Sequence, residues 1–205
     1  MFDISSEYDF LLGAWHLAYY TPGNYPDGSL PRRMLNFKDW KKDHDQHKSD
    51  VISWVNWSTE ELKNLDVRFD YIVRALGSNE VSIVKNKALD VLGAWLGKQL
   101  GASYLPELLL KSKLTKPLNS ISLKCDRESE LKGSYQLSNI AQDIDLNGKN
   151  VLIIDDVTTS GTTLREITDQ LTNKWPDVSC YSFCLGRTRR DNNANNSINI
   201  SYYFK

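Results

Sequence analysis

The sequence lacks the patterns that place a chain in a membrane or outside the cell. Nowhere do about 18 uncharged apolar residues run together, and the first residues form neither a basic leader nor an apolar signal segment. The three cysteines include no C-x-x-C pair, which argues against a disulfide framework and a thiolate zinc site. We therefore expect a cytoplasmic protein with reduced thiols and no membrane partner.

An excess of charge of one sign is also missing. The 25 basic and 26 acidic residues nearly cancel, which removes the broad attraction that non-specific nucleic-acid binders need. Nucleic acid is therefore not expected as a partner. Two nucleotide-binding patterns are absent as well, because the chain contains neither G-x-x-x-x-G-K-[ST] nor G-x-G-x-x-G.

The 205 residues suffice for one sizeable core with a smaller appended part. Residues 1–66 carry four of the six tryptophans and all three histidines. We interpret them as a helical, aromatic-rich N-terminal extension or hood subdomain, and residues 67–205 as the core. Helices are expected in the extension from the apolar spacing of Phe10, Leu11, Ala14 and Leu17, over residues 36–48, and after a capping box formed by Ser58 and Glu61.

From Phe69 onward, short apolar runs alternate with amphipathic helices, which is typical of βαβ units and a parallel sheet. We therefore predict an α/β fold with helices on both faces of a parallel sheet. The long polar stretch 111–149 separates two strands, and its part 111–136 has the length and lysine content of a functional lid. Expected strands are 71–76, 108–110, 135–137, 151–154, 178–185 and a terminal edge strand 198–204, with a helix over 88–100 closed by Gly101.

The most informative segment reads VLIIDDVTTSGTTL, from Val151 to Leu164. Its four apolar residues predict a buried strand, and the two acids then fall at the end where open α/β sheets place their ligands. Small residues follow and lead into a helix, so that backbone amides and the positive end of that helix can hold a phosphate. The predicted phosphate-binding residues are Val157, Thr158, Thr159, Ser160, Gly161, Thr162 and Thr163.

Asp155 and Asp156 would repel a bare phosphate, so the ligand should also offer hydroxyls or a metal. A ribose 5-phosphate satisfies both requirements. The alternative is a turn whose acids only cap a helix, which the full pattern disfavours.

The segment resembles the signature of the type I phosphoribosyltransferases. The similarity extends in order and spacing to the ComF-like subgroup, through Lys87 to Gly101, Leu108 to Lys111, Thr115 to Pro117, Arg127 and Gly133. It implies that Asp155 and Asp156 hold the ribose hydroxyls of 5-phosphoribosyl 1-diphosphate and, indirectly, Mg²⁺. It further implies a diphosphate loop beginning Arg74-Ala75-Leu76, with Lys111 and Arg127 as lid contacts; alternatively, Arg74 is a strand residue with its head at the surface.

Two departures from the family pattern bear on the substrate. The chain has no four-cysteine zinc element at its start, unlike the ComF-like proteins it resembles. Purine-salvage members carry an acid three positions after the second acid of the pair, where this chain has Thr159. A purine acceptor is therefore not favoured.

The resemblance implies an enzyme that transfers the phosphoribosyl group to an unidentified nitrogenous acceptor and releases diphosphate. The alternative is a non-catalytic regulator that binds phosphoribosyl diphosphate, or a ComF-like protein associated with competence and DNA uptake. A homodimer stays open. Two further groups are weighed: Trp40, Trp54 and Trp57 with Tyr19, Tyr20 and Tyr25 as base-stacking residues or, preferably, core; and Asp43, His44, Asp45 and His47 as metal ligands or, preferably, a solvated helix face.

Overall fold

The computed structural model describes residues 1–21, 23, 25–38, 45–116, 121, 123–189, 198 and 201–204, without the side chains of 46, 124, 127 and 128. Its centre is a six-stranded sheet in the order β1-β2-β8-β7-β3-β4. Neighbouring strands run parallel, except that β1 is antiparallel to β2. The strands are β1 (Phe2–Asp3), β2 (Gly13–Tyr20), β3 (Tyr71–Arg74), β4 (Ser103–Tyr104), β7 (Asn150–Thr158) and β8 (Ser179–Thr188).

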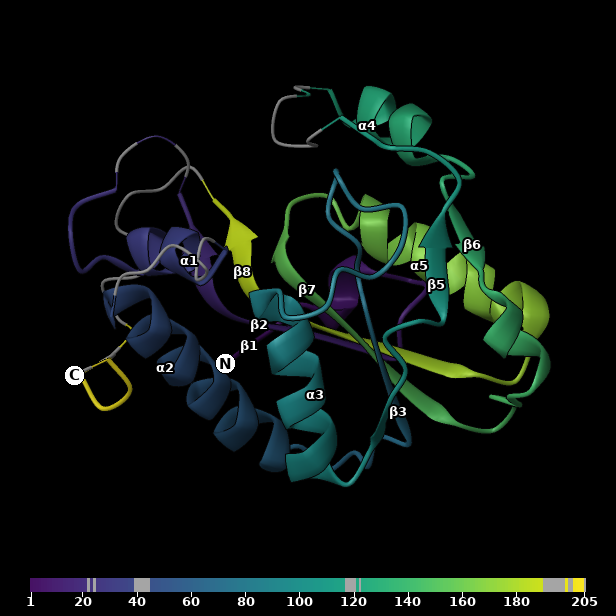
Figure 1. The fold of residues 1–205 in the computed structure, drawn as a ribbon, viewed down its shortest axis with the longest axis horizontal. Helices are drawn as coiled ribbons and strands as arrows, with labels where there is room; N and C mark the ends of the chain where they lie inside the picture. The colour runs from purple at the N-terminus through teal and green to yellow at the C-terminus, as the bar shows by residue number, and fades with distance from the viewer. Residues whose placement is uncertain are drawn as a thin grey trace.

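Helices cover both faces of this sheet, as predicted (Figure 1). On one face lie α1 (Leu30–Lys38), α2 (Asp45–Lys63) and α3 (Ala88–Leu100), and on the other lies α5 (Thr162–Lys174). Beside α5 are α4 (Lys124–Leu131) and a two-stranded antiparallel sheet of β5 (Leu109–Lys111) and β6 (Tyr135–Leu137). Two short 3-10 turns, η1 (Ser5–Glu7) and η3 (Asn139–Gln142), complete the described elements.

The alternation of side chains along β7 divides the core in two. Leu152 and Ile154 pack among the residues of α1, α2 and α3, whereas Val151 and Ile153 pack against α5, and all four are fully buried. A strand covered on both faces needs a continuous apolar run, and the sequence supplies one. The predicted strand at 151–154 is therefore confirmed.

The predicted helix from Phe10 to Leu17 is wrong, because residues 13–20 form β2, which pairs in parallel with β8. The run from Ala14 to Ala18 is buried throughout, as expected of a strand covered on both faces. Residues from the proposed extension thus belong to the central sheet. The boundary between residues 1–66 and 67–205 stays a prediction.

The other helix boundaries in this region also differ from expectation. Helix α1 begins at Leu30 rather than at Asn36, and residues 39–44 lie outside the described part of the chain. Helix α2 runs through Ser58 and Glu61 without a break. The Ser58 hydroxyl donates to the Trp54 carbonyl at 2.6 Å, one turn back in the same helix, so it does not cap a new helix.

Two strand predictions need correction in the same way. The predicted strand 108–110 appears as β5, but it pairs with β6 and does not join the central sheet. Residues 201–203 form a turn, so the terminal edge strand is not formed there; residues 199–200 lie outside the described part. Among the helices described, none has the length and apolarity needed to cross a membrane.

Candidate functional site

A pocket opens where β7 extends beyond the end of its neighbour β3. Strand β3 ends at Arg74, and the last backbone bond between the two strands runs from the Ala75 amide to the Ile154 carbonyl, at 2.9 Å. Strand β7 continues to Thr158 with β8 as its described partner. The edge of β7 from Asp155 onward therefore faces a cavity of about 650 Å³.

The cavity gathers most of the residues that the sequence singled out. The predicted site residues that line the cavity are Asp155, Asp156, Val157, Thr158, Thr159, Ser160, Gly161, Thr162, Thr163, Arg74, Ala75, Leu76 and Lys111. Arg127 belongs to α4, but its side chain lies outside the described part, as does that of Lys124. Their functional roles, and the role of residues 111–136 as a lid, stay predictions.

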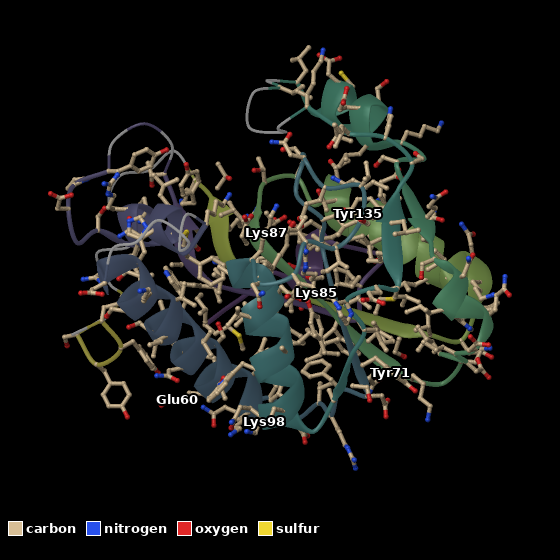
Figure 2. The ribbon with its side chains drawn as sticks, viewed as in Figure 1. Glu60, Tyr71, Lys85, Lys87, Lys98 and Tyr135 are labelled. Carbon is tan, nitrogen blue, oxygen red and sulfur yellow. The ribbon has the colours of Figure 1, made fainter. Side chains whose placement is uncertain are left out.

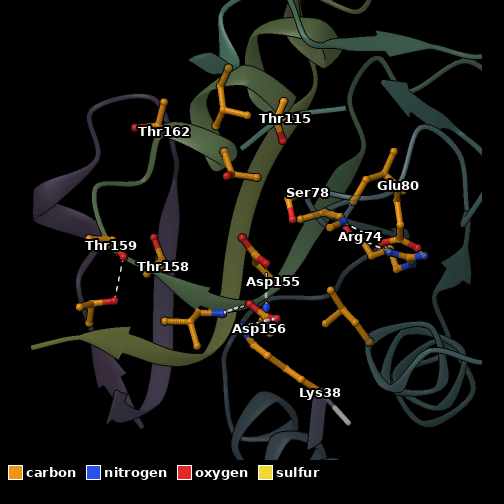
Figure 3. Close-up of a pocket in the computed structure, with 18 of the residues that line it drawn as sticks. Lys38, Arg74, Ser78, Glu80, Thr115, Asp155, Asp156, Thr158, Thr159 and Thr162 are labelled. Carbon is orange, nitrogen blue, oxygen red and sulfur yellow. Dashed lines mark hydrogen bonds and ion pairs between the residues drawn. The ribbon is translucent and has the colours of Figure 1, made fainter. Parts of the chain in front are cut away.

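The two acids are held at the floor of the cavity by their own backbone. The Asp156 amide donates to Oδ1 of Asp155 at 2.8 Å, and the Val157 amide donates to Oδ1 of Asp156 at 2.6 Å. Burial, followed by the neighbouring Asp156 charge, raises the pKa of Asp155. The second oxygen of Asp156 pairs with Nζ of Lys38 at 3.0 Å (Figure 3).

The turn after β7 has the form expected of an anion cradle. Gly161 adopts a left-handed conformation with φ of 74° immediately before α5 begins at Thr162. The first bond of that helix runs from the Arg165 amide to the Gly161 carbonyl, so the amides of residues 162–164 have no intrahelical acceptor. Amides at a helix start, with the dipole behind them, favour an anion.

The packing around this turn requires a glycine at its centre. A Cβ atom on Gly161 would lie 2.3 Å from Cε1 of Tyr8, closer than real contacts allow. The Tyr8 hydroxyl lies 3.4 Å from Oγ1 of Thr158, and Ser160 and Thr162 share a hydroxyl bond of 2.7 Å. The turn therefore cannot shift freely, because Tyr8 of the N-terminal segment packs against it.

The loop after β3 is shaped by a buried ion pair. The Arg74 guanidinium donates to both carboxylate oxygens of Glu80, at 2.9 and 3.1 Å, and the two side chains are 1% and 2% exposed. Burial alone would raise the pKa of Glu80, but hydrogen bonds from Arg74 and the Gly77 amide outweigh it and lower that pKa to about 2. The alternative that placed the head of Arg74 at the surface is wrong.

Lys111 and Tyr135 support the same loop from the opposite side. Nζ of Lys111 donates to the Gly77 carbonyl at 3.0 Å and to the Thr115 hydroxyl at 3.3 Å. The Tyr135 hydroxyl accepts from the Leu76 amide at 3.0 Å. Burial lowers the pKa of Lys111 to about 8. Lys87 lies just before α3 (Figure 2) and reaches Glu80 at 3.3 Å, and Tyr135 belongs to β6.

Residues 1–66 contribute Tyr20, Phe37 and Lys38 to the cavity lining. Tyr20 was weighed as a base-stacking residue or, preferably, as core, whereas Phe37, Lys38 and Thr188 of β8 were not expected at the site. No local motif marks them, because they reach the site through the packing of α1 and β2 against β8. Trp54 and Trp57 are instead buried in the core, as favoured, whereas Trp40, Asp43 and His44 lie outside the described part.

Divalent metal binding fits the acids of this pocket only in part. Within the described ranges, no three histidine, cysteine, aspartate or glutamate side chains gather to hold a metal. Carboxylate oxygens such as those of Asp155 and Asp156 suit Mg²⁺, which commonly keeps water and substrate phosphates as its other ligands. Glu80 is not free to join them, because Arg74 occupies both its oxygens.

Comparison with known protein families decides which of these features belong to a recognised domain. Residues 103–201 match the phosphoribosyl transferase domain. The match covers just under half of the chain and includes β5, β6, β7, α5 and β8. It supports the expectation of a phosphoribosyltransferase. The loop after β3, and the lining residues 20, 37 and 38, lie outside the matched range.

Solved structures give a weaker likeness, and no curated protein matches the chain significantly. A hypoxanthine-guanine phosphoribosyltransferase from Bacillus anthracis is 15% identical, with a TM-score of 0.41 over 69% of this chain and 68% of that one. An adenine phosphoribosyl transferase from Trypanosoma brucei, in complex with AMP, pyrophosphate and ribose-5-phosphate, is 12% identical, with a TM-score of 0.44 over 83% and 75%. At this level the likeness carries no argument about substrate.

Proposed function

We propose that the chain transfers the phosphoribosyl group of 5-phosphoribosyl 1-diphosphate to a nitrogenous acceptor and releases diphosphate. The observation that carries this proposal is the junction of β7 and α5. Two carboxylates face the cavity from the strand, and within six residues the chain turns at Gly161 and presents the free amides of a helix start. One ligand that needs both features is a ribose bearing a 5-phosphate.

In this proposal Asp155 and Asp156 accept hydrogen bonds from the ribose hydroxyls, while residues 158–163 bind the 5-phosphate. The raised pKa of Asp155 suits this role, because a carboxyl group that is easily protonated can lie beside a second carboxylate with little electrostatic repulsion. The ribose then lies along the exposed edge of β7.

The diphosphate is assigned to the loop that begins at Arg74. Lys87, Lys111 and Lys116 border this end of the cavity, so cationic side chains surround the position of the leaving group. The Arg74–Glu80 pair keeps the loop in shape. Arg74 therefore contributes mainly by fixing the backbone of residues 75–78, rather than by offering a free guanidinium to the ligand.

The reaction needs electrostatic stabilisation more than a nucleophile from the protein. Positive charge develops on the ribose ring and negative charge on the departing diphosphate. In this assignment the carboxylates lie near the ribose and the lysines lie near the diphosphate, so both charges are stabilised. Asp155 and Asp156 would hold Mg²⁺ indirectly, and the ion would supply further charge stabilisation of the leaving group. Closure of residues 111–136, including Arg127, would exclude water from the ring.

Diphosphate release tests the proposal directly. The protein is mixed with 5-phosphoribosyl 1-diphosphate, Mg²⁺ and each of a panel of nitrogenous acceptors, and diphosphate is measured. Acceptor-dependent release supports the transferase. Donor binding without release on any acceptor would instead favour the non-catalytic regulator, and absence of donor binding would reject both.

The proposed affiliation with the ComF-like subgroup rests on the order and spacing of the residues named in the sequence analysis. The structure adds that Lys87, Lys111 and Thr115, three members of that pattern, line the cavity. A role in competence or DNA uptake, a homodimer and a cytoplasmic location stay predictions.

A further inference from the structure

Lys38 is a cation at a particular end of the cavity. It is the last residue of α1, its side chain is 43% exposed, and its Nζ pairs with Asp156 at 3.0 Å. The Asp156 charge, which outweighs the effect of burial, raises the pKa of Lys38, so the side chain is charged at neutral pH. The cavity therefore holds a lysine supplied by the N-terminal part of the chain.

The order of strands separates this lysine from the leaving group. The sheet runs β3, β7, β8, β2, so the loop after β3 lies on one side of the β7 acids, and β8, β2 and α1 lie on the other. Figure 3 shows Arg74, Ser78 and Glu80 together on one side of Asp155, whereas Lys38 approaches Asp156 from another direction. In an in-line displacement of diphosphate, the acceptor attacks C1 from the face opposite the leaving group.

The described side chains that line the cavity on the side of β8, β2 and α1 differ chemically from those at the proposed diphosphate end. Tyr20 belongs to a ring pair with Tyr25, with centroids 5.9 Å apart and planes at 23°, and Phe37 is buried beside Lys38. Thr159 and Thr188 share a hydroxyl bond of 2.7 Å. Apart from the two acids assigned to the ribose and the aliphatic Val157, the described side chains on this side are aromatic, hydroxylic or cationic.

Resting on the proposed function, we infer that Lys38 is a specificity-determining residue that binds the acceptor, and that the acceptor is a planar nitrogen heterocycle bearing a carboxylate. Ribose hydroxyls engage Asp156 when the donor binds, which leaves the Lys38 ammonium without its present partner. A carboxylate on the acceptor replaces that partner, while Tyr20 and Phe37 border the ring.

A carboxylate fits this end of the cavity better than a phosphate does. Lys38 offers one positive charge, and it stands at the C-terminal end of α1, where the helix carbonyls carry partial negative charge. A dianionic group would meet that negative end with one ammonium group to offset it, whereas a monoanion is matched. In the transfer, the acceptor nitrogen gives its electron pair to C1, any hydrogen on that nitrogen leaves as a proton to solvent, and the C1–O bond breaks with its pair leaving on diphosphate. Lys38 forms no covalent bond.

Matched acid and neutral acceptors test the inference. Nicotinate is compared with nicotinamide, and orotate with uracil, by calorimetric titration into protein saturated with ribose 5-phosphate and Mg²⁺. A charge-assisted hydrogen bond predicts that the acid of at least one pair binds about tenfold or more tightly than its neutral partner. Lys38→Met should abolish that preference, and Lys38→Arg should retain part of it.

The matched control is Lys87→Met at the diphosphate end of the same cavity. Lys87 and Lys38 are almost equally exposed, at 42% and 43%, and each pairs with one carboxylate of the cavity lining. Lys87→Met should leave the preference for the acid unchanged. Three results would overturn the inference and leave the proposed function standing. They are equal affinity for the two members of each pair, no binding by either member, and a preference that survives Lys38→Met. Failure of ribose 5-phosphate itself to bind would overturn the proposed function and the inference with it.

Discussion

The Arg74 guanidinium and the Glu80 carboxylate face each other through two hydrogen bonds of 2.9 and 3.1 Å inside the wall of the cavity. Both side chains are almost completely buried, so removing one charge strands the other away from water. We expect Glu80→Gln to lower the free energy of unfolding by about 3–5 kcal/mol. Urea denaturation at neutral pH measures the loss. Glu107→Gln, which breaks the exposed pair with Lys85, should cost about 1 kcal/mol or less.

The same pair predicts how stability responds to acid. The pKa of Glu80 falls from its ordinary value of 4.5 to about 2 on folding. Its contribution is therefore complete above pH 4.5 and is lost as the pH falls from there through 2. The gap in unfolding free energy between wild type and Glu80→Gln should shrink over that interval. A gap that stays constant down to pH 2 would show that the carboxylate charge does not stabilise the loop.

Lys111 should affect stability and ligand binding in opposite directions. Its buried ammonium has a pKa of about 8, below the ordinary value of 10.5, so the unfolded chain binds more protons between these values. The contribution of Lys111 to stability therefore rises with pH over that window. Lys111→Met should not lower stability at pH 7 through loss of the charge.

Donor affinity should respond to Lys111 in the reverse sense. Deprotonation above pH 8 removes a cation near the proposed diphosphate site, so affinity for 5-phosphoribosyl 1-diphosphate should fall as the pH rises. Lys111→Met should weaken binding by on the order of tenfold or more at pH 7 and flatten this dependence. Calorimetry between pH 6.5 and 9.5 makes the comparison. Lys113→Met, at an exposed position outside the cavity lining, is the control.

Gly161→Ala should disable the phosphate turn. The residue has a φ of 74°, and a Cβ atom would lie 2.3 Å from the Tyr8 ring. The left-handed conformation alone costs about 1–2 kcal/mol in a residue other than glycine, and the contact forces the turn to move. We expect affinity for ribose 5-phosphate to fall well beyond the change in stability. Gly101→Ala, with a φ of 68° and no atom near its Cβ, should share the strain and leave affinity intact.

The sequence was most informative where one short segment determines both structure and chemistry. The run from Val151 to Leu164 predicts a buried strand, two acids at its end and a helix start, because each follows from neighbouring residues. It failed at residues 13–20, where a short apolar run suits a buried strand and a buried helix equally. Pairing with β8 decides between them, and that partner lies more than 160 residues further along the chain.

The contribution of α1 could not be read from the sequence for a related reason. Lys38 meets Asp156 because α1 packs closely on β8, where a Cβ on Gly186 would lie 2.7 Å from the Met34 side chain. Nothing near Lys38 in the sequence indicates that contact. Glu80 was missed for a similar reason, because its role is to close the loop through its ion pair with Arg74.

The central claim is that Asp155 and Asp156 hold the ribose of 5-phosphoribosyl 1-diphosphate. The paired substitution Asp155→Asn and Asp156→Asn keeps the shape of both side chains, and the raised pKa of Asp155 indicates that folding does not require its charge. Calorimetric titration of 5-phosphoribosyl 1-diphosphate with Mg²⁺ into the wild type and the doubly substituted protein is the most direct test. The account predicts binding to the wild type and none to the substituted protein, with thermal unfolding unchanged. Equal affinity in the two proteins would contradict it.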